Sequence, residues 1–318
     1  MRIVFMGTPE FAVPSLESLL RSDVTVVGVV TQPDRPKGRG RTLAAPPVKL
    51  LSLKQGLPLL QPTKMKDPAF LDALKAWTPD YIVVTAFGRI LPPAILAIPR
   101  GCVNVHASLL PKYRGAGPIQ WAIINGERET GITTMLMDEG MDTGPMLLQE
   151  ATPILPDDTA GSLSARLADI GGRLAVETLR RLKEGTVSPR PQDHAQATMA
   201  PLLKKEDGLI DWAMDAPAIA NRIRGMSPWP GAYTYAKDDR LTVWTAAPSE
   251  GRGNASIPGA IVEVKKDAIL VAAGTGHLAV TEIQPANGRR MSVAQYLSGH
   301  PLSPGLVLGA GPLPTDVE

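Results

Sequence analysis

Short apolar runs alternate with amphipathic stretches through the first 184 residues. Residues 2–6 (RIVFM) and 24–30 (VTVVGVV) are rich in β-branched residues, and between them apolar side chains recur at helical spacing. Residues 81–85 (YIVVT) are apolar throughout, which is typical of a parallel strand that is buried on both faces. Strand, helix and strand in this order predict an α/β domain with a Rossmann-like parallel sheet.

The same criteria predict the other elements of this α/β domain, which we place over residues 1–184. We expect helices over residues 48–56, 68–77, 118–125 and 159–184, and strands over residues 101–106 and 131–137. Asp67 comes directly before Pro68, so its carboxylate can cap the second of these helices. Residues 185–201 contain Gly185 and three prolines and have no apolar face, so we expect a linker there.

The pattern changes from Leu202 onward. A helix near residues 216–224 leads into five short apolar segments, at residues 231–235, 241–246, 260–264, 268–273 and 278–283. Short strands at such regular spacing predict a small antiparallel β-barrel of the oligonucleotide-binding (OB-like) type over residues 202–318. Residues 309–318 are expected to form a loose tail.

Composition is that of an ordinary globular protein. With 318 residues, of which 44% are hydrophobic and 20% charged, the chain is long enough for two domains that each have a core. No apolar run approaches the ~18 residues that a membrane span needs. The chain begins with a strand rather than with a secretion signal. We therefore expect a cytoplasmic protein that has no membrane partner.

Cysteine and histidine usage limits the possible chemistry. Cys102 is the single cysteine, which excludes an internal disulfide, and the four histidines are spaced too widely to indicate a metal site. Cys102 and His106 would lie about 13 Å apart in a strand, too far for a nucleophile and its base, so we predict a buried, inert thiol. The turn after the first strand, residues 7–9 (GTP), lacks the spaced glycines of a dinucleotide site, so no nicotinamide cofactor is expected.

The net charge of +2 is too small for the whole molecule to act as a polycation, so nucleic-acid binding would need local clusters. Residues 32–47 (QPDRPKGRGRTLAAPP) have no periodicity and are predicted to form a loop without secondary structure. Against one acid, Asp34, this loop carries Arg35, Lys37, Arg39 and Arg41. Cations between glycines can follow a phosphate backbone, although a solvated surface loop would have a similar composition.

A second basic face is predicted on the barrel, with scattered surface cations as the alternative. Its members would be Lys204, Lys205, Lys265, Lys266, Arg289 and Arg290.

Residues 101–106 place two polar side chains on one side of a strand. Asn104 and His106 alternate with valines, so they lie about 6.6 Å apart on the same face and can both reach one oxyanion. Asp142 follows 36 residues after His106, in the turn at residues 141–144 (MDTG). Such a turn is common by itself. However, one helix and one strand fill that separation, so the carboxylate can return beside the imidazole.

Several segments together resemble the folate-dependent formyltransferases. They are residues 5–11 (FMGTPEF), 104–106 (NVH), 108–111 (SLLP), 114–115 (RG), 118–119 (PI), 141–144 (MDTG), 210–212 (IDW) and 228–231 (PWPG). The chain has Ala107 and Gly117 where the family commonly has glycine and alanine, and neither change removes a functional group.

The resemblance implies transfer of a formyl group from N10 of 10-formyltetrahydrofolate, the donor cosubstrate, to the α-amino group of initiator methionyl-tRNA. Asn104 and His106 would hold the oxyanion, while Asp142 would orient the imidazole and help to remove the proton of the amine. Cations of residues 32–47 would grip the acceptor end of the tRNA. No metal is implied, and we expect a monomer. The pterin would contact the ends of two strands, at Phe87, Gly88, Ile90, Leu91, Ser108, Leu109, Leu110 and Pro111.

Two alternatives remain at the level of sequence. An enzyme of the same family that formylates an amino sugar nucleotide would keep the same three side chains, and the basic loop argues against it. A noncatalytic RNA-binding module would use the barrel and the loop, but it would not explain why Asn104, His106 and Asp142 occur together.

Overall fold

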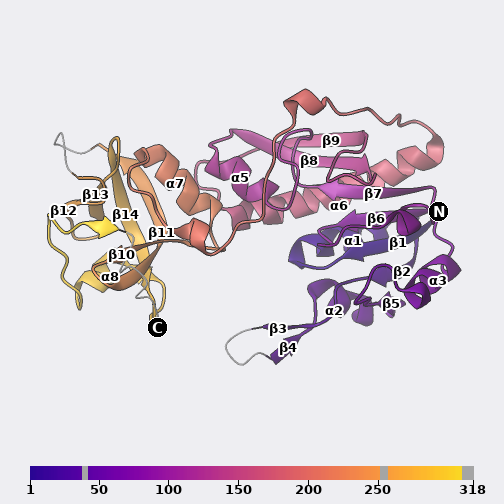
Figure 1. The fold of residues 1–318 in the computed structure, drawn as a ribbon, viewed down its shortest axis with the longest axis horizontal. Helices are drawn as coiled ribbons and strands as arrows, with labels where there is room; N and C mark the ends of the chain where they lie inside the picture. The colour runs from indigo at the N-terminus through magenta and orange to yellow at the C-terminus, as the bar shows by residue number, and fades with distance from the viewer. Residues whose placement is uncertain (38–41, 251–256, 310–318) are drawn as a thin grey trace, which may run out of the picture. The chain divides into compact units, whose positions relative to one another are not determined.

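A computed structural model describes residues 1–37, 42–250 and 257–309, except for the side chains of Lys37 and Thr42. The described chain falls into two compact units (Figure 1). The first consists of Met1–Pro118, Glu129–Pro153 and Leu163–Pro201, and the second of Ile119–Arg128, Ile154–Ser162 and the residues from Leu202 onward. The predicted tail lies almost wholly outside the described residues, because only Gly309 belongs to them.

A seven-stranded sheet forms the centre of the first unit, in the order β5-β2-β1-β6-β7-β8-β9. The pairs from β5 to β7 are parallel, whereas β8 and β9 are antiparallel to their neighbours. The predicted Rossmann-like parallel sheet is therefore confirmed, with an antiparallel hairpin added at one edge. The strands are β1 (Arg2–Gly7), β2 (Thr25–Val30), β5 (Leu59–Leu60), β6 (Tyr81–Thr85), β7 (Gly101–His106), β8 (Glu129–Leu136) and β9 (Met146–Pro153).

Helices and buried strands of this unit follow the sequence pattern closely. Residues 3–6 of β1 have no exposed surface, as a strand between two layers of helices requires. Asp67 caps its helix as predicted, because its carboxylate accepts a hydrogen bond from the Ala69 N–H at 3.1 Å. The helical elements are η1 (Glu10–Ala12), α1 (Val13–Leu20), α2 (Pro47–Lys54), α3 (Pro68–Ala76), α4 (Pro93–Leu96), α6 (Ala160–Glu184) and η2 (His194–Gln196).

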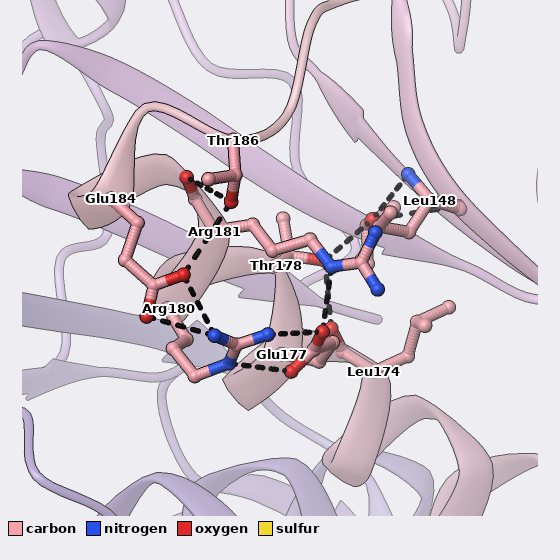
Figure 2. A network of polar contacts seen from close by, with 9 residues as sticks. Leu148, Leu174, Glu177, Thr178, Arg180, Arg181, Glu184 and Thr186 are labelled. Carbon is pink, nitrogen blue, oxygen red and sulfur yellow. Dashed lines mark hydrogen bonds and ion pairs between the residues drawn. The ribbon is translucent and has the colours of Figure 1, made fainter.

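The long helix α6 supports the β8–β9 hairpin (Figure 2). Thr178 lies on its buried face, 2.8 Å from the Thr134 hydroxyl of β8, and Thr134 in turn accepts from the Leu148 N–H of β9 at 3.1 Å. On its exposed face Glu177 accepts from Arg180 and Arg181, and these guanidinium groups lower the pKa of the Glu177 carboxyl to about 2. The buried face of α6 therefore contacts the hairpin, and ion pairs within the helix stabilise its exposed face.

The second unit is built on an antiparallel sheet in the order β12-β13-β14-β11-β10-β16. Ala260, next to β12, forms an antiparallel bridge with Val307, next to β16, so the sheet curls back on itself. This arrangement confirms the predicted antiparallel barrel. Its strands are β10 (Ala232–Ala236), β11 (Asp239–Ser249), β12 (Ile261–Val264), β13 (Ile269–Ala272), β14 (His277–Pro285), β15 (Met291–Ser292) and β16 (Leu308–Gly309), and its helices are α5 (Pro118–Ile124), α7 (Ala216–Gly225) and α8 (Val293–Leu297).

Three features differ from the sequence-based expectations. Residues 32–47 are not wholly irregular, because β3 (Arg35–Lys37) pairs antiparallel with β4 (Thr42–Ala44). Residues 185–201 are not a free linker. Arg190 exchanges two 2.8 Å backbone hydrogen bonds with Met146, and this pairing through backbone groups leaves no trace in the hydropathy pattern. Residues 119–128 lie within the predicted first domain, yet Ile124 packs on Leu203 and Met226 of the second unit.

Candidate active site

A strand and a loop of the first unit carry the predicted catalytic side chains. Asn104 and His106 lie on β7, which runs between parallel β6 and antiparallel β8. Residues 137–145 connect β8 to β9 and contain Asp142. The separation between His106 and Asp142 is filled by α5 and β8, the one helix and one strand that were predicted. Because β8 pairs directly with β7, its turn ends beside Asn104.

The three side chains meet at the Asp142 carboxylate. Asn104 Nδ2 donates to Asp142 Oδ1 at 3.1 Å, and His106 Nδ1 lies 3.6 Å from Asp142 Oδ2. The His106 side chain is 6% exposed and that of Asp142 is 16% exposed, so the site is largely but not completely shielded from water. An amide NH₂ group carries two hydrogens, so Asn104 can donate to a further group while it holds Asp142.

Backbone groups of residues 113–115 complete the surroundings of the carboxylate and the imidazole. The Gly115 N–H donates to Asp142 Oδ2 at 2.9 Å. His106 Nε2 lies 2.9 Å from the Tyr113 carbonyl oxygen, which can only accept, so Nε2 carries the hydrogen in this contact. Neither of these backbone partners is evident from the sequence pattern. The signal for Gly115 was its place in a glycine-rich stretch, since its φ of +113° favours glycine.

The turn that carries Asp142 has an unusual backbone. Asp142 has a φ of +53°, a left-handed conformation that aspartate tolerates better than most residues. A Cβ atom on Gly144 would collide with the Leu136 carbonyl oxygen, so this position requires glycine. Asp138 accepts from the Thr143 hydroxyl at 2.7 Å and from the Gly140 N–H at 3.0 Å. These constraints explain why the turn combines aspartate, threonine and glycine.

In the first predicted pterin-binding segment, residues 108–111, backbone groups already make hydrogen bonds to other parts of the protein. Thr133 Oγ1 donates to the Ser108 carbonyl at 2.6 Å and accepts from the Leu110 N–H at 3.1 Å. Gln149 Nε2 donates to the Leu110 carbonyl at 2.9 Å. Ser108 and Leu110 are buried, whereas Leu109 and Pro111 are half-buried. The backbone groups that were expected to face a ligand are thus engaged at Ser108 and Leu110.

The second predicted segment follows β6 and lies at the same edge of the sheet, because Val84 of β6 is in register with Asn104 of β7. The Phe87 carbonyl accepts from Gln32 Nε2 at 2.7 Å and from the Thr8 hydroxyl at 3.1 Å. Phe87 and Leu91 are buried and Gly88 is exposed, whereas the Ile90 side chain is 77% exposed. The exposed Ile90 side chain is an apolar contact that a flat ring can cover.

The base of the predicted tRNA-binding loop is held by a polar network. Lys49 Nζ contacts both carboxylate oxygens of Asp34 at 2.8 Å, and Gln61 Nε2 donates to Asp34 Oδ1 at 2.9 Å. The Gln61 hydrogen bond and the Lys49 charge lower the pKa of the Asp34 carboxyl. The single acid of this loop is therefore neutralised by residues outside the loop.

The predicted basic residues are described to different extents. Arg35 is exposed and donates to Gln32 Oε1, and in the second unit Lys204 and Lys205 are exposed. Arg39, Arg41 and the side chain of Lys37 lie outside the described part of the structure.

A search of the described residues gives no group of three or more His, Cys, Asp or Glu side chains that could hold a metal ion. Within the same residues, every helix is too short or too polar to cross a membrane.

Comparison with known proteins identifies the class. Residues 1–179 match the family described as Formyl transferase, and residues 202–301 match the family described as Formyl transferase, C-terminal domain. The chain therefore belongs to the formyltransferase family, and the resemblance found in the sequence is confirmed.

The chain is also similar to particular members of this family and to a solved structure. The chain is 52% identical to a methionyl-tRNA formyltransferase of Citrifermentans bemidjiense, over 97% of this chain and 96% of the relative. It is 53% identical to a methionyl-tRNA formyltransferase of Trichlorobacter lovleyi, over 96% of each chain. Its fold resembles an N-formyltransferase of Helicobacter canadensis, solved with folinic acid and dTDP-3-aminofucose, with a TM-score of 0.66 at 19% identity over 87% of this chain and 98% of that one.

Proposed function

We propose that this chain is an enzyme that formylates the α-amino group of methionyl-initiator tRNA, with 10-formyltetrahydrofolate as the formyl donor. Relatives that share more than half of its residues along nearly their whole length carry the name of that activity. The single observation that carries the proposal is the convergence of Asn104, His106 and Asp142, with contacts of 3.1 and 3.6 Å at one carboxylate. The product, N-formylmethionyl-tRNA, serves the initiation of translation.

The reaction needs an acceptor for one proton and donors for one oxyanion. The amine nitrogen attacks the formyl carbon, and a tetrahedral intermediate with a negatively charged oxygen forms. Asn104 Nδ2 and His106 Nδ1 both lie at the Asp142 carboxylate, and we assign these two groups as the donors to that oxygen. His106 Nδ1 donates in the imidazolium form, because Nε2 already carries the hydrogen that faces the Tyr113 carbonyl. Asp142 takes the proton that the amine loses. When the bond from the formyl carbon to N10 breaks, a proton returns to N10 and tetrahydrofolate leaves.

We assign the two substrates to two different surfaces, an apolar one for the formyl donor and a basic one for the tRNA. The formyl donor would lie against residues 87–91 and 108–111, where Ile90 offers an exposed apolar contact. Contacts to the Ser108 and Leu110 backbone would use only the second lone pair of each carbonyl, since the first is engaged. Phosphates of the tRNA would be held by the cations of the loop at residues 32–47 and by Lys204 and Lys205.

The decisive experiment incubates the protein with formyl-labelled 10-formyltetrahydrofolate and three acceptors in separate reactions: methionyl-initiator tRNA, uncharged initiator tRNA and a nucleotide-linked amino sugar. Label on the methionyl-tRNA alone is the expected result. Label on the amino sugar would replace the proposed acceptor by that of the alternative enzyme. Tight binding of tRNA without any transfer of label would favour the noncatalytic RNA-binding module.

A further inference from the structure

The buried amide of Gln192 holds the backbone of the Asp142 turn. Its Nε2 donates to the Asp142 carbonyl at 2.8 Å and to the Gly144 carbonyl at 2.7 Å. The side chain is only 6% exposed, so these carbonyls have little water with which to exchange the bonds. One glutamine NH₂ group has two hydrogens and thus satisfies both carbonyls at once.

Arg114 fixes the other end of the same amide. Its Nη2 and Nε donate to Gln192 Oε1 at 2.7 and 3.1 Å, and the residue is 6% exposed. The guanidinium also faces His194 Nδ1 at 3.2 Å. Arg114 donates two hydrogen bonds to the amide oxygen, and a flipped Gln192 side chain would place its NH₂ group against the guanidinium donors, so the NH₂ group points at the turn.

The next residue along the chain reaches the same aspartate from a different side. The Gly115 N–H donates to the Asp142 carboxylate at 2.9 Å, while Arg114 acts through Gln192 on the Asp142 carbonyl. Asp142 adopts a left-handed φ of +53°, which costs some free energy even for aspartate, so contacts from its surroundings help to hold it. Gln192, which lies in the segment predicted to be a linker, contributes to that constraint through its two bonds to the turn, and Arg114 holds Gln192 in place.

We propose that Gln192, locked by Arg114, is a positioning residue that holds the Asp142 carboxylate against Asn104 and His106. This inference rests on the proposed function, since it assigns Gln192 a part in that reaction without contact to substrate. A displacement of about 1 Å in a catalytic group can cost about 10²-fold in rate, so loss of the two carbonyl contacts is expected to reduce kcat by that order.

The first test is Gln192→Glu, which keeps an acceptor for Arg114 but removes both donors to the turn. We expect kcat for methionyl-tRNA formylation to fall about 10²-fold while KM for each substrate changes less than about twofold. Gln196→Glu is the matched control, because it introduces the same charge in the same segment at an exposed side chain that bonds Asp193. If Q192E fails to fold, Gln192→Asn, which shortens the side chain by one carbon, takes its place.

A double-mutant cycle separates positioning from a general structural effect. In the Asp142→Asn background, Q192E should cause little further loss of kcat, because the group that it positions is already disabled. Hydrogen exchange provides a readout that does not depend on activity. The amides of residues 138–144 should exchange at least about tenfold faster in Q192E than in the wild type or in Q196E.

The outcomes distinguish the two proposals. Wild-type protein that transfers no formyl group would refute the proposed function, while the exchange experiment would still decide whether Gln192 holds the turn. Full kcat in Q192E, the same fold loss in both backgrounds, or unchanged amide exchange of residues 138–144 would each overturn the positioning role.

Discussion

Asn104 Nδ2 donates to Asp142 Oδ1 at 3.1 Å across 38 residues of sequence. The contact exists because β8 runs antiparallel to β7, with Met135 in register with Asn104, and the loop that carries Asp142 begins directly after β8. A carboxamide donor and a carboxylate acceptor in contact can serve the two opposite needs of formyl transfer, which are to stabilise a new negative charge and to accept a proton.

Removal of any member of this trio should affect turnover rather than binding. Asn104→Ala, His106→Ala and Asp142→Ala are each expected to lower kcat about 10²–10³-fold, which is the usual cost of one oxyanion donor or base. Single-turnover formylation and a folate titration would measure rate and affinity separately. Asn287→Ala, at an exposed position, is the control for asparagine. A variant of the trio with wild-type turnover would contradict its assignment.

Gly144→Ala should displace the Asp142 turn. The new Cβ would collide with the Leu136 carbonyl, and overpacking of this kind costs about 1–3 kcal/mol of stability. We expect a lower melting temperature and a loss of kcat of about 10²-fold. Gly299→Ala adds the same methyl group where no atom lies within 4 Å, and it should be neutral in both measurements. Equal behaviour of the two variants would show that the turn is not tightly constrained.

Arg39→Ala and Arg41→Ala should each weaken tRNA binding and reduce its dependence on salt. Each phosphate contact that is lost removes about one unit from the slope of log Kd against log salt concentration. Filter binding over a range of salt concentrations would measure the slope, with folate affinity as the specificity check. Arg21→Ala is a control with the same charge change on an exposed side chain that pairs with Glu17. An unchanged slope would remove the loop from the tRNA site.

Cys102 should be unreactive in the folded protein. Burial in the core raises the pKa of its thiol to about 12, so only about one thiol in 10⁴ is ionised at pH 8. An Ellman titration at pH 8 should detect no thiol in the native protein and one per chain after denaturation. The unfolded thiol ionises near pH 8.5, so the native state should lose stability as the pH rises above that value. Rapid native reactivity would place Cys102 outside the core.

Glu177 should stabilise the protein through exposed ion pairs. Its pKa falls to about 2 in the folded state, so its contribution is complete above about pH 4.5 and is lost as the pH falls through about 2. Glu177→Gln should lower the melting temperature slightly at pH 7, less so in high salt, and not at all below pH 2. Glu10→Gln, at another exposed acid, is the control. A difference that persists in strong acid would point to packing instead of charge.

Much of the fold could be predicted from the sequence, because the spacing of apolar residues indicates which positions are buried. β6 and β7 have the predicted bounds, and β1, β2, α3, α6 and α7 lie within one or two residues of them. β9 was missed because its burial changes irregularly along its length, with buried residues only at Met146, Leu147 and Thr152. The meeting of Asn104, His106 and Asp142 was predictable from chain separation, since one helix and one strand fit between them.

The remaining contacts of the candidate site could not be predicted, because they are made by groups that leave no hydropathy pattern in the sequence. The Tyr113 carbonyl and the Gly115 N–H are backbone atoms, whose direction depends on φ values of +60° and +113° and not on residue type. Gln192 lies in a segment that has no apolar periodicity. Hydrogen bonds hold this segment to the first unit, and a hydropathy pattern does not indicate hydrogen bonds.

The path of the chain between the two units restricts how this protein could exchange parts with a homologue. The second unit includes residues 119–128 and 154–162, so neither unit is one uninterrupted stretch. A chimaera made with a single crossover near residue 201 would take Ile124 from one parent, and Leu203 and Met226, on which it packs, from the other. Successful recombination therefore requires that these apolar partners have coevolved or are transplanted together.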